Sequence, residues 1–177
     1  MNKAKIRNIT NWLRTEYNLT IPIDVEALAN GIGATIKKDD LGEVSLSGFA
    51  VQKHGKKFIG VNNTESDVRQ RFTIAHELGH LFLHKDSSVN YDQGGMMLFR
   101  DEHSSEGSDL KEVEANRFAA ELLMPAETLR KDVSSEKTFD LINGDDTTRA
   151  KVIKKLASKY NVSEQAMSIR LTTLYFN

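Results

Sequence analysis

The feature that most constrains this chain is His76-Glu77-Leu78-Gly79-His80, which stands within the apolar stretch from Phe72 to Leu83. Residues four apart lie on one face of an α-helix, one turn from each other, so the two imidazoles can converge on a single metal ion. Glu77 is rotated about 100° from His76 and falls beside such a metal. Two neutral nitrogen ligands and a nearby carboxylate that takes a proton from water are what a hydrolytic zinc centre requires. The alternative interpretation is a pair of histidines that serves only the core.

Length and composition restrict the class of protein. The chain has 177 residues, of which 39% are apolar and 28% are charged, a balance typical of one medium globular domain. It contains no cysteine, which excludes disulfides and thiolate metal ligands. The sequence has neither an apolar run of membrane-spanning length nor the continuous apolar stretch of a secretory signal. We therefore expect a cytoplasmic protein.

The first part of the sequence indicates two helices followed by short strands. Apolar residues at helical spacing predict a helix over residues 3–17, and Asp24 is a candidate N-cap for a short second helix. Stretches rich in β-forming residues predict strands at 34–37, 47–52 and 57–62. A hairpin tip is expected at His54-Gly55-Lys56, so we interpret His54 as a solvated residue.

The helix that carries the histidine pair is predicted over residues 66–85. It is apolar around most of its circumference, which is typical of a buried helix. Gly79 costs such a helix about 1 kcal/mol relative to alanine, so we expect another element to approach closely there. His84 lies on the same face as His76 and His80. Eight residues of helix span about 12 Å, too far for His76 and His84 to bind one zinc ion, so we interpret His84 as structural.

A third ligand is predicted from the phase of the next helix, residues 109–124, which Pro125 ends. The apolar stripe of this helix is centred near Ala119, and at 100° per residue Glu112 falls about 20° from that centre. A carboxylate on a buried face is costly unless it is paired or bound to metal. Glu112 is therefore the candidate ligand. Asn116, one turn later on the same face, is placed to hydrogen-bond a ligating side chain.

The other acids of this helix are expected to be solvated. Glu114 falls about 140° from Ala119, on the same side as Arg117 and Glu121.

Two histidines and one glutamate leave a fourth position open for water, as in catalytic rather than structural zinc sites. The connection between the two ligand-bearing helices is polar apart from Met96–Phe99, which is predicted to be a strand.

The C-terminal segment contains two predicted helices, 151–159 and 164–175. Their spacing matches a DNA-binding helix-turn-helix loosely, with Asn161 where glycine is common. Residues 147–177 hold six bases and one acid, which makes a nucleic-acid contact one interpretation. The would-be recognition helix carries only Arg170 as a base, so we favour a helical pair that packs on the catalytic domain or recruits a partner.

Two motifs of the chain together resemble the ImmA/IrrE family of metallopeptidases: Arg71-Phe-Thr-Ile-Ala-His-Glu-Leu-Gly-His-Leu-Phe-Leu-His84 and Glu112-Val-Glu-Ala-Asn-Arg-Phe-Ala-Ala-Glu-Leu-Leu-Met-Pro125. The likeness covers most of the chain, including the short strands and the helical tail. We therefore expect an α+β, zincin-like catalytic domain over residues 1–130, with a small mixed sheet and an active-site helix. A helical subdomain, partner-docking or helix-turn-helix-like, is expected over residues 131–177.

The resemblance also implies a zinc ion (Zn2+) held by His76, His80 and Glu112, with Glu77 as the catalytic base. Members of the family act beside helix-turn-helix transcriptional repressors in mobile genetic elements or stress responses. The implied function is that of a zinc-dependent endopeptidase that cleaves or inactivates such a repressor. The alternative is a transcriptional regulator without proteolysis, whose zinc site shapes the fold and whose C-terminal helices bind DNA or a partner.

Overall fold

Two helices precede the sheet. α1 (Lys3–Glu16) and α2 (Val25–Gly31) occupy the segments in which helices were predicted. Asp24 accepts a hydrogen bond from the Ala27 amide (2.9 Å) and so caps α2 as expected. The elements are those of a computed structural model of the chain, which describes residues 3–42, 46–84, 89–93, 107–135 and 145–175.

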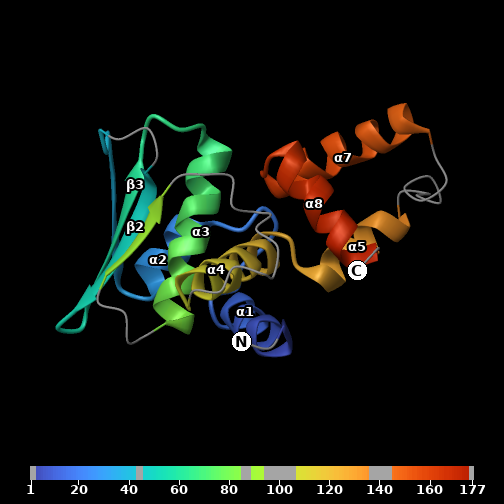
Figure 1. The fold of residues 1–177 in the computed structure, drawn as a ribbon. Coiled ribbons are helices and arrows are strands. Elements are labelled where there is room, and N and C mark those ends of the chain that lie inside the picture. Colours follow the sequence, from blue (N-terminus) through green and yellow to red (C-terminus); the bar gives the residue numbers. More distant parts are fainter. Residues whose placement is uncertain (1–2, 43–45, 85–88, 94–106, 136–144, 176–177) are drawn as a thin grey trace.

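The strands form one mixed sheet in the order β1-β3-β2-β4 (Figure 1). Their bounds are β1 Ala34–Asp39, β2 Leu46–Lys53, β3 Lys56–Asn62 and β4 Val89–Gln93. β1 runs parallel to β3, whereas β2 is antiparallel to both β3 and β4. His54 and Gly55 form the turn between β2 and β3, both with positive φ (49° and 77°), which suits the twist of a two-residue hairpin. His54 is exposed there, as predicted.

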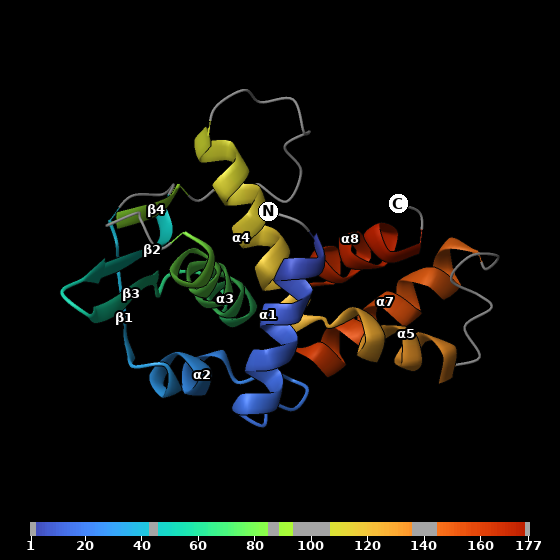
Figure 2. The ribbon, with the colours of Figure 1, turned by 90° about the horizontal axis from the view of Figure 1, so that it is seen from below.

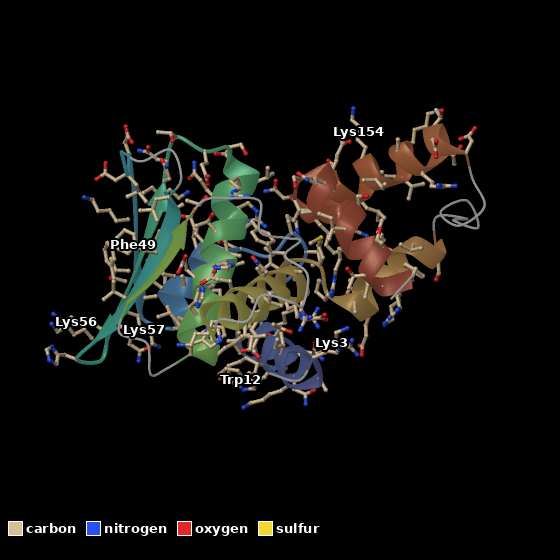
Figure 3. All side chains as sticks on the ribbon, in the orientation of Figure 1. Lys3, Trp12, Phe49, Lys56, Lys57 and Lys154 are labelled. Carbon is tan, nitrogen blue, oxygen red and sulfur yellow. The ribbon has the colours of Figure 1, made fainter. Side chains whose placement is uncertain are left out.

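The two faces of the sheet differ in what covers them. Ala50, Ile59 and Val61 are fully buried on the face toward α3 (Asp67–Leu83), which lies against the sheet in both views (Figures 1 and 2). On the opposite face the ring centroids of Phe49 and Phe58 lie 6.0 Å apart, and Figure 3 shows Phe49 on the side away from the helices. The alternation of the strands thus gives α3 an apolar surface to pack on.

α3 and α4 (Gly107–Leu123) cross in close contact at Gly79. A Cβ atom on Gly79 would lie 3.0 Å from Ala115 Cα and 3.2 Å from Ala115 O. The close approach expected at this glycine is confirmed, and the approaching element is α4. Next to this crossing, the rings of Phe82 and Phe118 stack with centroids 5.9 Å apart.

Within the part of the chain that the structure describes, three further helices follow α4: α5 (Ala126–Ser135), α7 (Asp146–Tyr160) and α8 (Glu164–Tyr175). Asn161 adopts the left-handed conformation (φ 51°, ψ 55°) and ends α7, a position that asparagine can take in place of glycine. Buried side chains of α7 and α8 join the same apolar cluster as those of α1 and α4: Leu156, Ala157, Tyr160, Ala166, Met167 and Leu171. The helical pair therefore contributes to the core, while the division of the chain at residue 130 stays a prediction.

Arg71 connects α3 to two distant segments. Its Nη2 donates to Ile23 O (2.8 Å), ahead of α2, and its Nε donates to Asn161 O (3.1 Å), between α7 and α8. Burial lowers the pKa of the Arg71 guanidinium below its usual value. One side chain of the motif-bearing helix thus joins the N-terminal segment to the C-terminal turn.

One prediction from helix phasing is wrong. Glu121, predicted on the solvated face of α4, is only 7% exposed and forms an ion pair with Arg170 of α8. Arg7 of α1 also lies near it, with Nε 3.9 Å from Glu121 Oε1. The prediction fails because α4 contacts α1 and α8 as well as α3, so its buried surface is not a single stripe. The strand predicted at Met96–Phe99 lies outside the described residues, and β4 belongs to the same connection.

The predicted fold class is confirmed. The chain is α+β, with a small mixed sheet, the buried helix α3 and a mostly helical C-terminal half. Of the helices within the described ranges, none is long and apolar enough to cross a membrane.

We expect Gly79→Ala to destabilise the protein, although alanine is the better helix former. A helix glycine without neighbours gains about 1 kcal/mol of stability on replacement by alanine. Here the added methyl group meets the backbone of Ala115, and such overpacking costs about 1–3 kcal/mol. Denaturant unfolding of the metal-free protein measures the difference, and Gly79→Val should be less stable still. A Gly79→Ala variant more stable than its parent would contradict the close crossing.

Candidate metal centre

α3 presents two histidines to the interior of the molecule. The side chains of His76 and His80 are 3% and 1% exposed, and their Nε2 atoms lie 3.0 Å apart. This proximity follows from their four-residue spacing on one helix. The helix period alone therefore brings two nitrogen donors to one point.

Glu112 reaches the same point from α4. Its Oε2 lies 3.0 Å from His76 Nε2 and its Oε1 lies 3.2 Å from His80 Nε2. The Glu112 carboxylate thus faces both imidazoles.

The three donor groups fit a tetrahedral divalent metal. Ligand atoms from His76, His80 and Glu112 all lie within 4.8 Å of one another. Around a zinc ion with bonds of about 2.0–2.1 Å, tetrahedral ligand atoms lie roughly 3.3–3.4 Å apart. The shortest distances between donor atoms of the three side chains, 3.0–3.2 Å, are close to this ligand–ligand distance. Three protein donors of nitrogen and oxygen type leave one tetrahedral position for a water molecule or a substrate.

Asn116 lies one turn beyond Glu112 on α4 and contacts the first histidine. Its Oδ1 is 2.9 Å from His76 Nδ1. An amide oxygen accepts a hydrogen bond, so His76 carries its hydrogen on Nδ1 and its Nε2 lone pair faces Glu112 and His80. The structure thus places Asn116 within hydrogen-bond distance of the His76 ring, while the role of this contact at a metal ligand stays a prediction.

Glu77 lies between the two histidines in sequence and is fully buried. Its neighbour in the sheet is Gly48 of β2, at which a Cβ atom would lie 3.7 Å from Glu77 Oε1. The same Cβ atom would lie 2.4 Å from Thr73 Cγ2 and 2.8 Å from Gly60 O, so only glycine fits between the sheet and α3 here. Sequence reasoning missed Gly48, although a glycine inside a predicted strand is a signal of close backbone approach.

His84 and Glu114 extend the polar cluster beyond the three donor groups. His84 Nδ1 lies 3.1 Å from His80 Nδ1, and His84 Nε2 lies 3.0 Å from Glu114 Oε2. Burial, followed by the nearby His80 and Lys111, lowers the pKa of His84 to about 4, so this imidazole is neutral. His84 stands outside the converging donor set, as its distance along the helix predicted.

The prediction that Glu114 is solvated is wrong. Its side chain is 13% exposed and faces His84, whose side chain is 7% exposed. The helical phase of Glu114 was assigned relative to a single apolar stripe, but His84 sits at the end of α3 and meets a second side of α4. A polar contact between two helices leaves no trace in the apolar pattern of either one.

Three comparisons relate the chain to known proteins. The sequence model of the peptidase M78 family, described as an IrrE N-terminal-like domain, matches residues 29–172. The uncharacterized immunity region protein 2 of Bacillus phage phi105 is 32% identical over 95 residues, which cover 54% of this chain and 55% of that protein. A solved structure of a Mycobacterium tuberculosis transcriptional regulator superposes with a TM-score of 0.64 at 17% identity, covering 97% of this chain and 47% of that one. The matched parts span about half of each relative, and the structural likeness shows the fold alone.

We expect the protein to bind one zinc ion per chain and Glu112→Ala to lose it, because that substitution removes one of three protein donors. Metal analysis after dialysis against a metal-buffered solution measures the stoichiometry. Glu16→Ala is the matched control, since Glu16 is an exposed glutamate at the end of α1. A Glu112→Ala protein that keeps a full complement of zinc would show that Glu112 is not a ligand.

Proposed function

The chain belongs to the M78 family of peptidases, the IrrE N-terminal-like family, and from this premise we propose that it is a zinc-dependent endopeptidase. The observation that carries the proposal is the convergence of His76, His80 and Glu112 beside the fully buried Glu77. A structural zinc site closes its coordination sphere with protein ligands, whereas the described residues supply three donors and leave a position open.

The roles of the chain's own residues follow from their positions. His76, His80 and Glu112 would hold the ion, which when bound supplies Lewis acidity toward a carbonyl group and lowers the pKa of water. Glu77 accepts the proton of the attacking water and delivers it to the amine that leaves. Because Glu77 is fully buried, bulk water does not compete for that proton. Asn116 keeps the His76 ring in the orientation that binding requires.

The proposed substrate is a helix-turn-helix transcriptional repressor in the cytoplasm, which the enzyme cleaves or inactivates to relieve repression. Two findings support this substrate class: the family membership and the relative from Bacillus phage phi105, which is named as an immunity region protein. An enzyme of this kind cleaves one regulatory protein rather than many peptides. It therefore needs a surface that recognises the folded partner.

The second candidate function, a regulator that binds DNA without proteolysis, is disfavoured by Arg170. This arginine is the only base of α8, and it is 8% exposed. Its Nε donates to Met124 O (3.0 Å) and its Nη2 pairs with Glu121. A buried guanidinium engaged in this way is not available to phosphate groups. The helix in the recognition position therefore presents no basic side chain to a duplex.

The exposed bases of this segment lie on α7 instead. They are Arg149, Lys151, Lys154, Lys155 and Lys159. Lys159 is engaged by Asp132 of α5, at 2.7 Å, whereas Lys154 projects outward from α7 (Figure 3). We propose that the exposed bases of α7 around Lys151 and Lys154, the docking face, bind an acidic surface of the repressor.

We expect Glu77→Gln to bind zinc normally and to lose proteolysis of a helix-turn-helix repressor that the parent protein cleaves. Glutamine has nearly the same shape as glutamate but cannot accept a proton. The measurement combines metal analysis with incubation of the enzyme and the repressor, with and without chelator, read on a gel. Glu16→Gln is the control and should cleave at the parental rate.

The outcomes separate the two candidate functions. Cleavage by Glu77→Gln at the parental rate would show that Glu77 is not the base. Binding of the repressor without cleavage by either the parent or Glu77→Gln would favour a regulator that acts through partner binding alone.

We expect the double substitution Lys151→Glu and Lys154→Glu to slow repressor cleavage at least tenfold at low ionic strength, because it reverses the charge of the proposed docking face. Zinc content and thermal stability should not change, since both side chains are exposed. Lys53→Glu with Lys56→Glu is the matched control, since these exposed residues pair at the β2–β3 hairpin. Figure 3 shows Lys56 at the end of the sheet away from Lys154. Equal cleavage by the two double variants would contradict docking on α7. Deleting the helices is no substitute, because Tyr160 and Met167 belong to the core.

A further inference from the structure

We propose that His84 and Glu114 are positioning residues for the metal centre: through a continuous hydrogen-bonded chain they hold His80 in its metal-binding tautomer and strengthen it as a ligand. The inference rests on the proposed metal site. It assigns a role to two side chains that are outside the donor set and that sequence reasoning treated as structural and solvated.

The chain of contacts runs from the interior of α3 to α4. His80 Nδ1 lies 3.1 Å from His84 Nδ1, one turn further along α3. His84 Nε2 then lies 3.0 Å from Glu114 Oε2 on α4. Both outer members are largely shielded from water, at 7% and 13% side-chain exposure. The first contact joins two ring nitrogens and the second joins a ring nitrogen to a carboxylate oxygen, so the position of one hydrogen determines the position of the next.

Only one assignment of hydrogens satisfies the whole chain and leaves a ligand. A carboxylate accepts, so His84 carries its hydrogen on Nε2 and donates it to Glu114. With this hydrogen on Nε2, the Nδ1 atom of His84 offers a lone pair, which accepts a hydrogen from His80 Nδ1. His80 is left with a lone pair on Nε2, the atom that faces His76 Nε2 and Glu112. The opposite tautomer of His80 would direct an N–H group into the position of the metal.

The two histidine ligands are supported unequally. His76 Nδ1 meets the neutral amide oxygen of Asn116 at 2.9 Å. The chain behind His80 ends in a carboxylate, and a hydrogen bond that leads to an ionised group is stronger and draws more positive charge onto the donor. His80 should therefore be the more electron-rich ligand of the pair, and loss of the Glu114 charge should weaken metal binding through it.

A purely structural role predicts something different. His84 and Glu114 also tie the end of α3 to α4, and a simple tie would stabilise the fold in the absence of metal. Such a tie would lower the stability of the metal-free variants without changing the ligand strength of His80. Metal affinity and metal-free stability, measured on the same variants, therefore separate the two roles.

The experiment uses the full chain stripped of metal, the variants Glu114→Gln and His84→Gln, and the control Glu16→Gln. Competition with a chromophoric chelator gives the Kd for Zn2+, and thermal unfolding gives the metal-free Tm. We expect Kd to rise roughly 10- to 100-fold in both variants, the usual effect of removing such a partner of a ligating histidine. Stoichiometry at saturation should remain one, and the metal-free Tm should match that of the control.

A second readout is the visible spectrum of the Co2+ form, which reports the ligand field. We expect the Glu114→Gln spectrum to keep tetrahedral intensity with shifted band positions. Parental Kd values and Co2+ spectra in both variants would overturn the inference and leave the proposed enzyme standing. A weaker Kd accompanied by a lower metal-free Tm and an unchanged Co2+ spectrum would also overturn it, in favour of the tie. A parent protein that binds neither ion would overturn the proposed function as well.

Discussion

The backbone crossing of α3 and α4 is the constraint on which the candidate centre depends. Gly79 has no side chain to hold α4 away, and the atoms it faces are the main chain of Ala115. Glu112 comes one turn before Ala115 on α4, and Asn116 directly follows Ala115. This close contact therefore lies beside the place where a carboxylate meets two imidazoles. A wider separation of the helices would move Glu112 away from donors that α3 alone keeps together.

An apolar surrounding makes the polar side chains of this centre depend on one another. α3 is buried from Thr73 to Leu81, between the sheet and α4, so a polar group there gains little from water. Hydrogen bonds offset this cost: His76 contacts Asn116, and His80 contacts His84. The arrangement leaves one nitrogen of each ring directed at the same point as the Glu112 carboxylate, which is what metal-assisted hydrolysis asks of a protein.

The parts of the fold and of the candidate site that could be predicted from the sequence are those that depend on helix periodicity. The four-residue spacing placed His76 and His80 together, and the phase of α4 brought Glu112 to the same point. Gly79 was informative because a glycine inside an apolar helix has an energetic cost that only a close neighbour explains. The rest could not be predicted because it depends on tertiary contacts. Glu121 and Glu114 were assigned to solvent because a helical phase assumes one covered side, whereas α4 meets α1, α3 and α8.

The hydrogen bonds of Arg71 determine which substitutions would remove the junction that this residue forms. Its two acceptors, Ile23 O and Asn161 O, belong to the main chain. Mutation of the residues that provide them exchanges side chains but leaves the carbonyl groups in place. The donor has less freedom, because a guanidinium directs its N–H groups in a rigid fork toward two separate acceptors, whereas the lysine ammonium is compact and donates from a single atom. The three-way junction therefore depends on the side chain of Arg71, whereas at Ile23 and Asn161 it depends only on main-chain carbonyl groups.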